Sequence, residues 1–237
     1  MMKFFLGVIV GVVVAILIGA GAVAVAFGHL GDVGNIEIGD RDKSADVTKT
    51  LELSDFDRIA IAGVYELDVT VGGDYSVEIS GSQEDLDRVK ASVEDGELIL
   101  DQRDHKRGDK KWRDRDAVTA KVTLPALSAI DVSGVVDADI EGVDAEDFEA
   151  DISGVGEMDV KGQCGHLKAS VSGVGALNAD ELKCKDVVVN VSGIGEANVY
   201  ASDAVDATVS GMGEISVYGS PAKVEKHGGL FSSIKVK

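Results

Sequence analysis

Apolar and polar residues alternate through the second half of the chain, in segments that recur about every twenty residues. Alternation with period two predicts β-strands with one buried face. The apolar positions of the first segment in each copy are Phe148, Ala150, Ile152, then Leu167, Ala169, Val171, then Val187, Val189, Val191. Those of the second segment are Met158, Val160, then Leu177, Ala179, then Ala197, Val199, then Ile215, Val217. We expect two strands per copy, sharing one core.

A short Ser-Gly motif separates the two segments of each copy. Its residues are Ser133, Gly134, then Ser153, Gly154, Gly156, then Ser172, Gly173, Gly175, then Ser192, Gly193, Gly195, then Ser210, Gly211, Gly213. A copy of this length is too small to bury its own apolar face, so neighbouring copies must supply the missing core. The sequence therefore predicts an all-β solenoid with about 18–20 residues per coil, regular over residues 128–220.

The glycines of this motif predict a tight corner, because glycine adopts positive φ without steric cost. We expect the serine hydroxyls to bond local amides. We also expect the apolar residue between the glycines (Val155, Val174, Ile194 or Met212) to pack toward the interior. The first copy has Val136 in place of the second glycine, which predicts a looser corner there.

Stacked coils about 4.8 Å apart would place equivalent outward residues in ladders. Asp159, Asn178 and Asn198 would lie one above another, and asparagine ladders stabilise such stacks. Two like-charged steps would destabilise the stack unless neutralised. These steps are Asp137 with Glu157 and Glu196 with Glu214. Solvated carboxylates explain this acidity better than a calcium site.

The region before the repeats also contains strand-like segments with turn signals between them, at Gly72-Gly73-Asp74 and Asp95-Gly96. Ser82, with acidic residues after it, predicts one short helix. The mixed-charge segment 101–116 contains Trp112, the only tryptophan, and is predicted to be an exposed loop. The expected strands are Arg58–Ala62, Tyr65–Val71, Ser76–Ser80, Glu97–Leu100 and Ala117–Thr123.

The N-terminus contains an uninterrupted apolar run, Phe4 to Phe27, which is long enough to cross a bilayer as a helix. Lys3 precedes it and acidic residues follow it, so the rest of the chain is predicted to be exported. Cleavage as a signal peptide after a small-x-small site such as Ala24-Val25-Ala26 is the alternative. We expect an anchor or signal at 1–30, a linker at 31–46 and a β-domain at 47–237, in the periplasm or outside the cell.

Composition narrows the class of partner. The formal net charge is -19, so nucleic acid is not an expected partner. Hydrophobic residues make up 45% of the chain but aromatic residues only 5%, beside 29 glycines. This mixture favours strands and turns over helices.

Several segments in order resemble the putative auto-transporter adhesin, head GIN domain, family over about residues 47–237. They are Phe56-Asp57-Arg58-Ile59, Gly96-Glu97-Leu98-Ile99, Leu124-Pro125-Ala126-Leu127, the Ser-Gly motifs and Tyr218-Gly219-Ser220-Pro221. The resemblance implies a bacterial, exported protein with a right-handed parallel β-helix. It implies no catalytic residues.

No spacing of His29, His105, His166 or His227 suggests a metal centre, and a motif repeated five times does not suit a single nucleophile. We therefore expect no catalytic, metal or cofactor site. Cys164 and Cys184 lie one coil apart, where a disulfide would fit, but their offsets from the preceding serines differ by one residue. Both a bridge and opposite-facing thiols remain open.

The expected function is a non-enzymatic, adhesin-like or structural module, attached to the membrane by its N-terminal helix and contacting an envelope protein or a glycan. One alternative is a polysaccharide-active β-helix enzyme, which would need side loops that form a cleft. Another is a self-assembling scaffold, which Lys223, Lys226, Lys235 and Lys237 near the open end would discourage.

Overall fold

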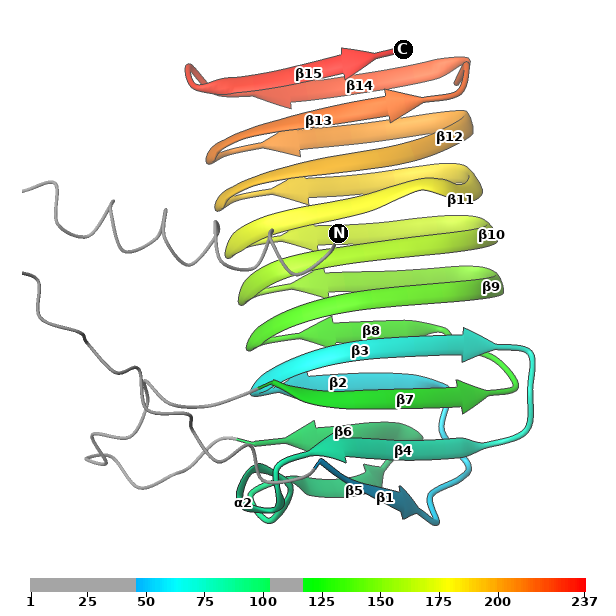
Figure 1. The fold of residues 1–237 in the computed structure, drawn as a ribbon. Coiled ribbons are helices and arrows are strands. Elements are labelled where there is room, and N and C mark those ends of the chain that lie inside the picture. The colour runs from blue at the N-terminus through cyan, green and yellow to red at the C-terminus, as the bar shows by residue number, and fades with distance from the viewer. Residues whose placement is uncertain (1–45, 103–116) are drawn as a thin grey trace, which may run out of the picture. The chain divides into compact units, whose positions relative to one another are not determined.

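The computed structural model describes residues 46–102 and 117–237, which form an all-β solenoid of about five turns (Figure 1). The chain divides after Arg41, and the described residues all belong to the second unit, Asp42–Lys237. The predicted N-terminal helix and the predicted loop with Trp112 lie outside the described residues. Among the residues described, no helix has the length and apolar character needed to span a membrane.

The part before the repeats contains short strands and one helix. Ser82 caps that helix, as predicted, because its Oγ accepts a hydrogen bond from the Asp85 amide at 3.1 Å. All five predicted strands are present, within one residue at each end. The elements are β1 (Val47–Leu51), β2 (Arg58–Ala62), β3 (Val64–Val71), β4 (Ser76–Gly81), α2 (Gln83–Leu86), β5 (Lys90–Glu94), β6 (Glu97–Asp101) and β7 (Val118–Leu124).

The repeats form long strands that each run through most of one coil. The elements are β8 (Ala129–Val132), β9 (Val135–Ile152), β10 (Val155–Val171), β11 (Val174–Val191), β12 (Ile194–Val209), β13 (Met212–Tyr218), β14 (Lys223–Gly228) and β15 (Ser232–Val236). Parallel pairing joins each long strand to the next in register, with shifts only near its middle.

Two sheet faces enclose the core. The first, here called face A, contains β7, β3, the first halves of β9 to β12, β13 and β15. The second, face B, contains β6, β2, β8, the second halves of β9 to β12, and β14. Each coil crosses from face A to face B at the register shifts, here called the bulged corner, and returns at the Ser-Gly corner.

The N-terminal coils do not stack in sequence order. The coil of β2 and β3 lies between the layer of β6 and β7 and the layer of β8 and β9. Beyond β6 and β7 the parallel stack ends, because β4, β1 and β5 pair antiparallel. The N-terminal end is therefore closed by a different kind of pairing from that of the repeats.

The inward positions predicted from the alternation are confirmed. Every apolar residue in the two sets of alternating positions is buried, and together they form one continuous core along the stack. The first coil adds larger side chains, among them Phe56 and Tyr65. The repeat region uses smaller residues, so its two faces can approach each other closely.

The expected reason for the motif glycines was wrong. Except at Gly156, whose φ of 157° is nearly extended, these glycines do not have positive φ. A Cβ on Gly173 would instead come closer to the carbonyl oxygen of Gly154 than the 3.0 Å that real Cβ atoms keep. Gly134 meets Gly63 in the same way. The first glycine of each motif is therefore required by the close approach of the coil beneath it.

The serines also act between coils rather than locally. Ser133 Oγ donates to the carbonyl oxygen of Ile61 at 3.2 Å, and Ser153 Oγ donates to that of Val132 at 3.4 Å. Ser172 Oγ bonds Ile152 in the same way. Each serine therefore ties its corner to the preceding coil, whereas bonds to local amides were expected.

The apolar residue between the glycines points outward, so the prediction that it packs inside was wrong. Exposed fractions are 40% at Val174, 47% at Ile194 and 54% at Met212. The alternation of the following strand explains this, because it extends back to the corner and leaves the second glycine on the inward side. Val136, which replaces that glycine in the first copy, is buried.

Candidate functional site

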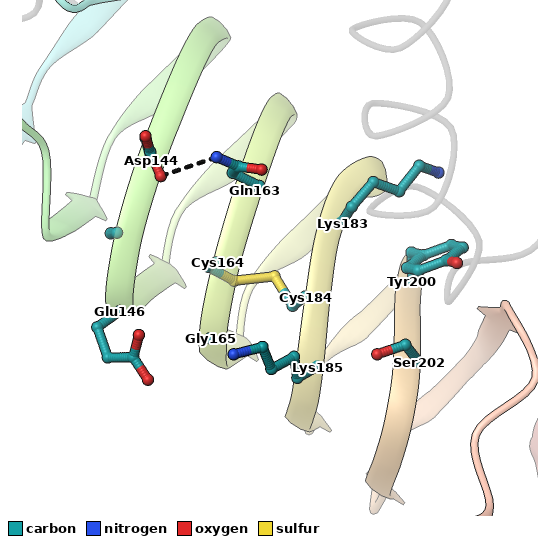
Figure 2. Close-up of a pocket in the computed structure, with 11 residues that line it drawn as sticks. Asp144, Glu146, Gln163, Cys164, Gly165, Lys183, Cys184, Lys185, Tyr200 and Ser202 are labelled. Carbon is teal, nitrogen blue, oxygen red and sulfur yellow. Dashed lines mark hydrogen bonds between the residues drawn. A yellow bond between two sulfur atoms is a disulfide. The ribbon is translucent and has the colours of Figure 1, made fainter.

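A groove with a volume of about 450 Å³ runs across β9 to β12 at the bulged corner (Figure 2). The coils differ in length there: three residues of β11, Asp180 to Leu182, have no partners in β12 between the pairs Ala179↔Val199 and Lys183↔Tyr200. Consecutive coils are therefore offset at this corner. The lining residues are Asp144, Ala145, Glu146, Gln163, Cys164, Gly165, Lys183, Cys184, Lys185, Tyr200 and Ser202.

A disulfide lies in the groove between Cys164 of β10 and Cys184 of β11. The two residues are register partners in the parallel ladder, with a Cα–Cα distance of 4.5 Å. The one-residue difference in serine offset does not turn them apart, because the register shift before Gly162 absorbs it. The question that the sequence left open is thus answered by a bridge between adjacent coils.

An aromatic ring and a lysine form one end of the groove. Lys183 Nζ lies 4.1 Å from the centroid of the Tyr200 ring and also donates to the carbonyl oxygen of Asp180 at 2.6 Å. A cation over an aromatic face is held by the quadrupole of the ring. The Tyr200 side chain is thereby kept beside Lys183, where it offers both a ring face and a hydroxyl.

Carboxylates and an amide form the other end. Gln163 Nε2 donates to Asp144 Oδ1 at 3.0 Å (Figure 2). His166, one strand position beyond the groove, has Nδ1 3.2 Å from Asp186 and Nε2 3.9 Å from Glu146. Donors and acceptors of both charges thus line a groove with little apolar surface. Such a lining suits a polar ligand bound through several hydrogen bonds.

Face A carries a separate concentration of negative charge, here called the acidic patch: Glu66, Asp68, Asp137, Asp139, Glu157 and Asp159. The pKa values of Asp137, Asp139 and Glu157 are raised, first by partial burial and then by neighbouring carboxylates. The charges of this patch therefore destabilise one another.

The predicted ladders are present on face A. Asp159, Asn178 and Asn198 are register partners, and Asn198 Nδ2 donates to Asn178 Oδ1 at 3.1 Å. The like-charged steps Asp137 with Glu157 and Glu196 with Glu214 are also present. Toward the C-terminus the acidity is offset, because Lys235 bonds Glu214 at 2.7 Å and lowers its pKa.

Of the residues singled out from the sequence, only the two cysteines lie in the groove, whereas the Ser-Gly motifs form the opposite corner. The sequence analysis missed Lys183, Tyr200 and the carboxylates of the groove. The available signal was the unequal serine spacing, which is 20, 19, 20 and 18 residues and marks coils of different length.

Comparison with known proteins agrees with this fold. The family model for the putative auto-transporter adhesin, head GIN domain, matches residues 55–221. The chain belongs to this family. The resemblance seen in the sequence is thus confirmed, and the repeats, the disulfide and the groove described above are features of a head GIN domain.

Solved structures share the fold of this head GIN domain. A putative adhesin from Bacteroides fragilis is 24% identical, with a TM-score of 0.66, and the match covers 81% of this chain and 97% of that one. A putative lipid binding protein from Parabacteroides distasonis is 18% identical, with a TM-score of 0.46, over 81% and 96% of the two chains. No curated protein matches the chain.

Proposed function

We propose that this head GIN domain is an exported, non-enzymatic binding module of the cell envelope, attached to the membrane through the segment Phe4–Phe27. The observation that carries the proposal is the groove at the bulged corner, together with the adhesin family to which the chain belongs. The bulged corner is where the otherwise uniform coils differ in length, and so where a recognition surface can be formed.

The chemistry of the groove favours a glycan or another polar chain of the envelope as the ligand. Hydroxyl groups of a sugar can donate to Asp144 and Glu146 and accept from Lys185 and Gln163, while a sugar ring can lie on Tyr200. An apolar molecule would gain little there, because ligand pockets for such molecules are mostly apolar.

Binding of envelope material to the purified protein tests the proposal. We expect Tyr200→Ala to weaken binding of an isolated envelope glycan fraction by about tenfold, since it removes one stacking contact and the hydroxyl. Tyr218→Ala is the matched control, because Tyr218 is the register partner of Tyr200 one coil on and also carries a lysine, Lys237, over its ring at 4.7 Å.

Two results would contradict the proposal. If Tyr200→Ala binds the fraction as tightly as the parent protein, the groove is not the contact. If the parent protein releases soluble sugars from the fraction, the polysaccharide-active enzyme becomes the better account.

The membrane attachment is tested separately, by N-terminal sequencing of the protein isolated from its native membrane. A retained anchor predicts a start at Met1 or Met2. A start near Ala24 to Phe27 would show cleavage as a signal peptide instead.

A further inference from the structure

The last coil of face B ends on strand β14, Lys223–Gly228, every residue of which is exposed (Figure 1). It pairs with β12 in parallel register, so Glu225 is the partner of Asp206 and His227 is the partner of Thr208. Glu225 and His227 are two residues apart on one strand and therefore point to the same side. Pairing thus brings two side chains of β14 beside one of β12.

These three side chains converge. Within the described part of the chain, Asp206, Glu225 and His227 form a group whose ligand atoms all lie within 4.8 Å of one another. His227 Nε2 is 3.8 Å from Asp206 Oδ1. Two ligands of a tetrahedral Zn²⁺ at about 2.1 Å lie about 3.4 Å apart, so small side-chain rotations would bring this pair to coordination distance.

One of these atoms has neither solvent nor a donor. Asp206 Oδ1 is shielded from water and accepts no hydrogen bond within the described residues, although the rest of its side chain is partly exposed. An unpaired carboxylate oxygen of this kind is costly, and a cation beside it would remove the cost. This orphaned oxygen is a reason for a cation here that the clustering alone does not give.

Glu225 remains an ionised donor. Lys223 contacts its Oε1 at 2.8 Å, which leaves a second oxygen to offer. The hydrogen bond from Lys223 and its charge lower the pKa of Glu225, and the nearby His227 lowers it further. The carboxylate therefore needs no proton removed before it can bind a metal ion.

We propose that Asp206, Glu225 and His227 bind one divalent transition-metal ion of the Zn²⁺ class. One imidazole and two carboxylates suit such an ion, whereas Ca²⁺ takes six to eight oxygen ligands. Water completes the coordination, since Glu225 and His227 are exposed. The ion would link β14 to β12 and so fasten the terminal coil to the stack, independently of the groove.

Zinc titration of the full chain in detergent micelles, followed by calorimetry, tests this site. We expect one saturable Zn²⁺ site that His227→Gln weakens by at least about tenfold. Asp206→Asn should have the same effect. The matched control is His166→Gln, because His166 also lies between two carboxylates, Asp186 and Glu146, but is outside the three-residue group.

Hydrogen exchange gives a second readout of position. Zn²⁺ should slow exchange in 223–228 in the parent and in His166→Gln, and leave His227→Gln unchanged. Circular dichroism and an intact disulfide show that each variant is folded, and Asp206→Asn alone decides if His227→Gln is not. Absence of saturable binding, equal affinity in the folded variants, or protection elsewhere than 223–228 would overturn the proposal.

Discussion

At the scale of single residues, the glycine of each Ser-Gly corner sets how closely two coils approach. Gly63 belongs to this series although no Ser-Gly motif marks it, because a Cβ on Gly134 would meet the backbone of Gly63. The glycines of the turns differ from these: Gly72 and Gly96 have φ of 105° and 78°, and need no close neighbour to explain them. Glycine therefore serves two separate purposes in this chain.

Replacing a corner glycine tests this distinction. We expect Gly193→Ala to lower the free energy of unfolding by about 3 kcal/mol, because the new methyl group meets the backbone of Gly173. In Gly81→Ala, the methyl group would make only ordinary contacts, of 3.6 Å or more. We therefore expect a change of less than about 1 kcal/mol there, measured for both variants by urea denaturation. Equal losses would contradict the account.

The acidic patch predicts a dependence on pH. The folded state raises the pKa values of Asp137, Asp139 and Glu157, so it holds protons more tightly than the unfolded chain. Stability from these groups is therefore greatest below their ordinary pKa of about 4 and is lost as pH rises through the raised values. The thermal midpoint should rise as pH falls from 7 to about 5.

Asp139→Asn isolates this effect and copies the asparagines of the following coils. We expect it to add about 0.5 kcal/mol to the free energy of unfolding at pH 7, and to reduce the pH dependence. Asp74→Asn, an exposed position away from the patch, is the control and should change neither. Loss of stability in Asp139→Asn would show that the patch is not self-repelling.

At the scale of elements, strand alternation reaches into the corners, and this decides which valines carry the core. Val171 is fully buried at the end of β10, while Val174, three residues later, begins β11 with 40% of its surface exposed. The same element boundary separates buried from exposed apolar residues in the following coils.

The two valines therefore form a matched pair. Val171→Ala should lower the free energy of unfolding by about 2 kcal/mol, because it leaves a cavity between stacked coils. Val174→Ala should cost less than about 1 kcal/mol. Chemical denaturation of both proteins checks the order, and a larger loss at Val174 would mean that the corner is packed rather than exposed.

The disulfide joins two neighbouring elements across a short loop. Cys164 and Cys184 are 20 residues apart, so the bridge should stabilise the fold by about 3 kcal/mol by restricting the unfolded chain. Cys164→Ala with Cys184→Ala should lose that amount. Thiol titration of the denatured parent protein should find no free thiol, and two free thiols would refute the bridge.

At the scale of the whole molecule, the local period was readable and the order of layers was not. Period-two alternation identifies Ile152 or Val191 as core without further information. The place of β2 and β3 between later segments depends on pairings such as Tyr65 with Val118 and Val136, which are 53 and 71 residues away. No local pattern encodes them.

The candidate sites depend on the same long-range register. Tyr200 enters the groove because β12 lacks partners for three residues of β11, and His227 meets Asp206 because β14 pairs with β12. Residues of neither site stand close together in the sequence. This is why a search for spaced ligands among the four histidines expected no metal site.

The stacked register is the central claim, and one distance measures it directly. Glu66 and Glu214 are outward residues of face A, separated by five steps of parallel pairing through Asp137, Glu157, Ala176 and Glu196. At about 4.8 Å per step, spin labels on Glu66→Cys and Glu214→Cys should lie about 24 Å apart, within the reach of the label linkers. Pulsed electron paramagnetic resonance should show one narrow peak near that distance. A broad distribution, or a peak beyond about 40 Å, would contradict the stack.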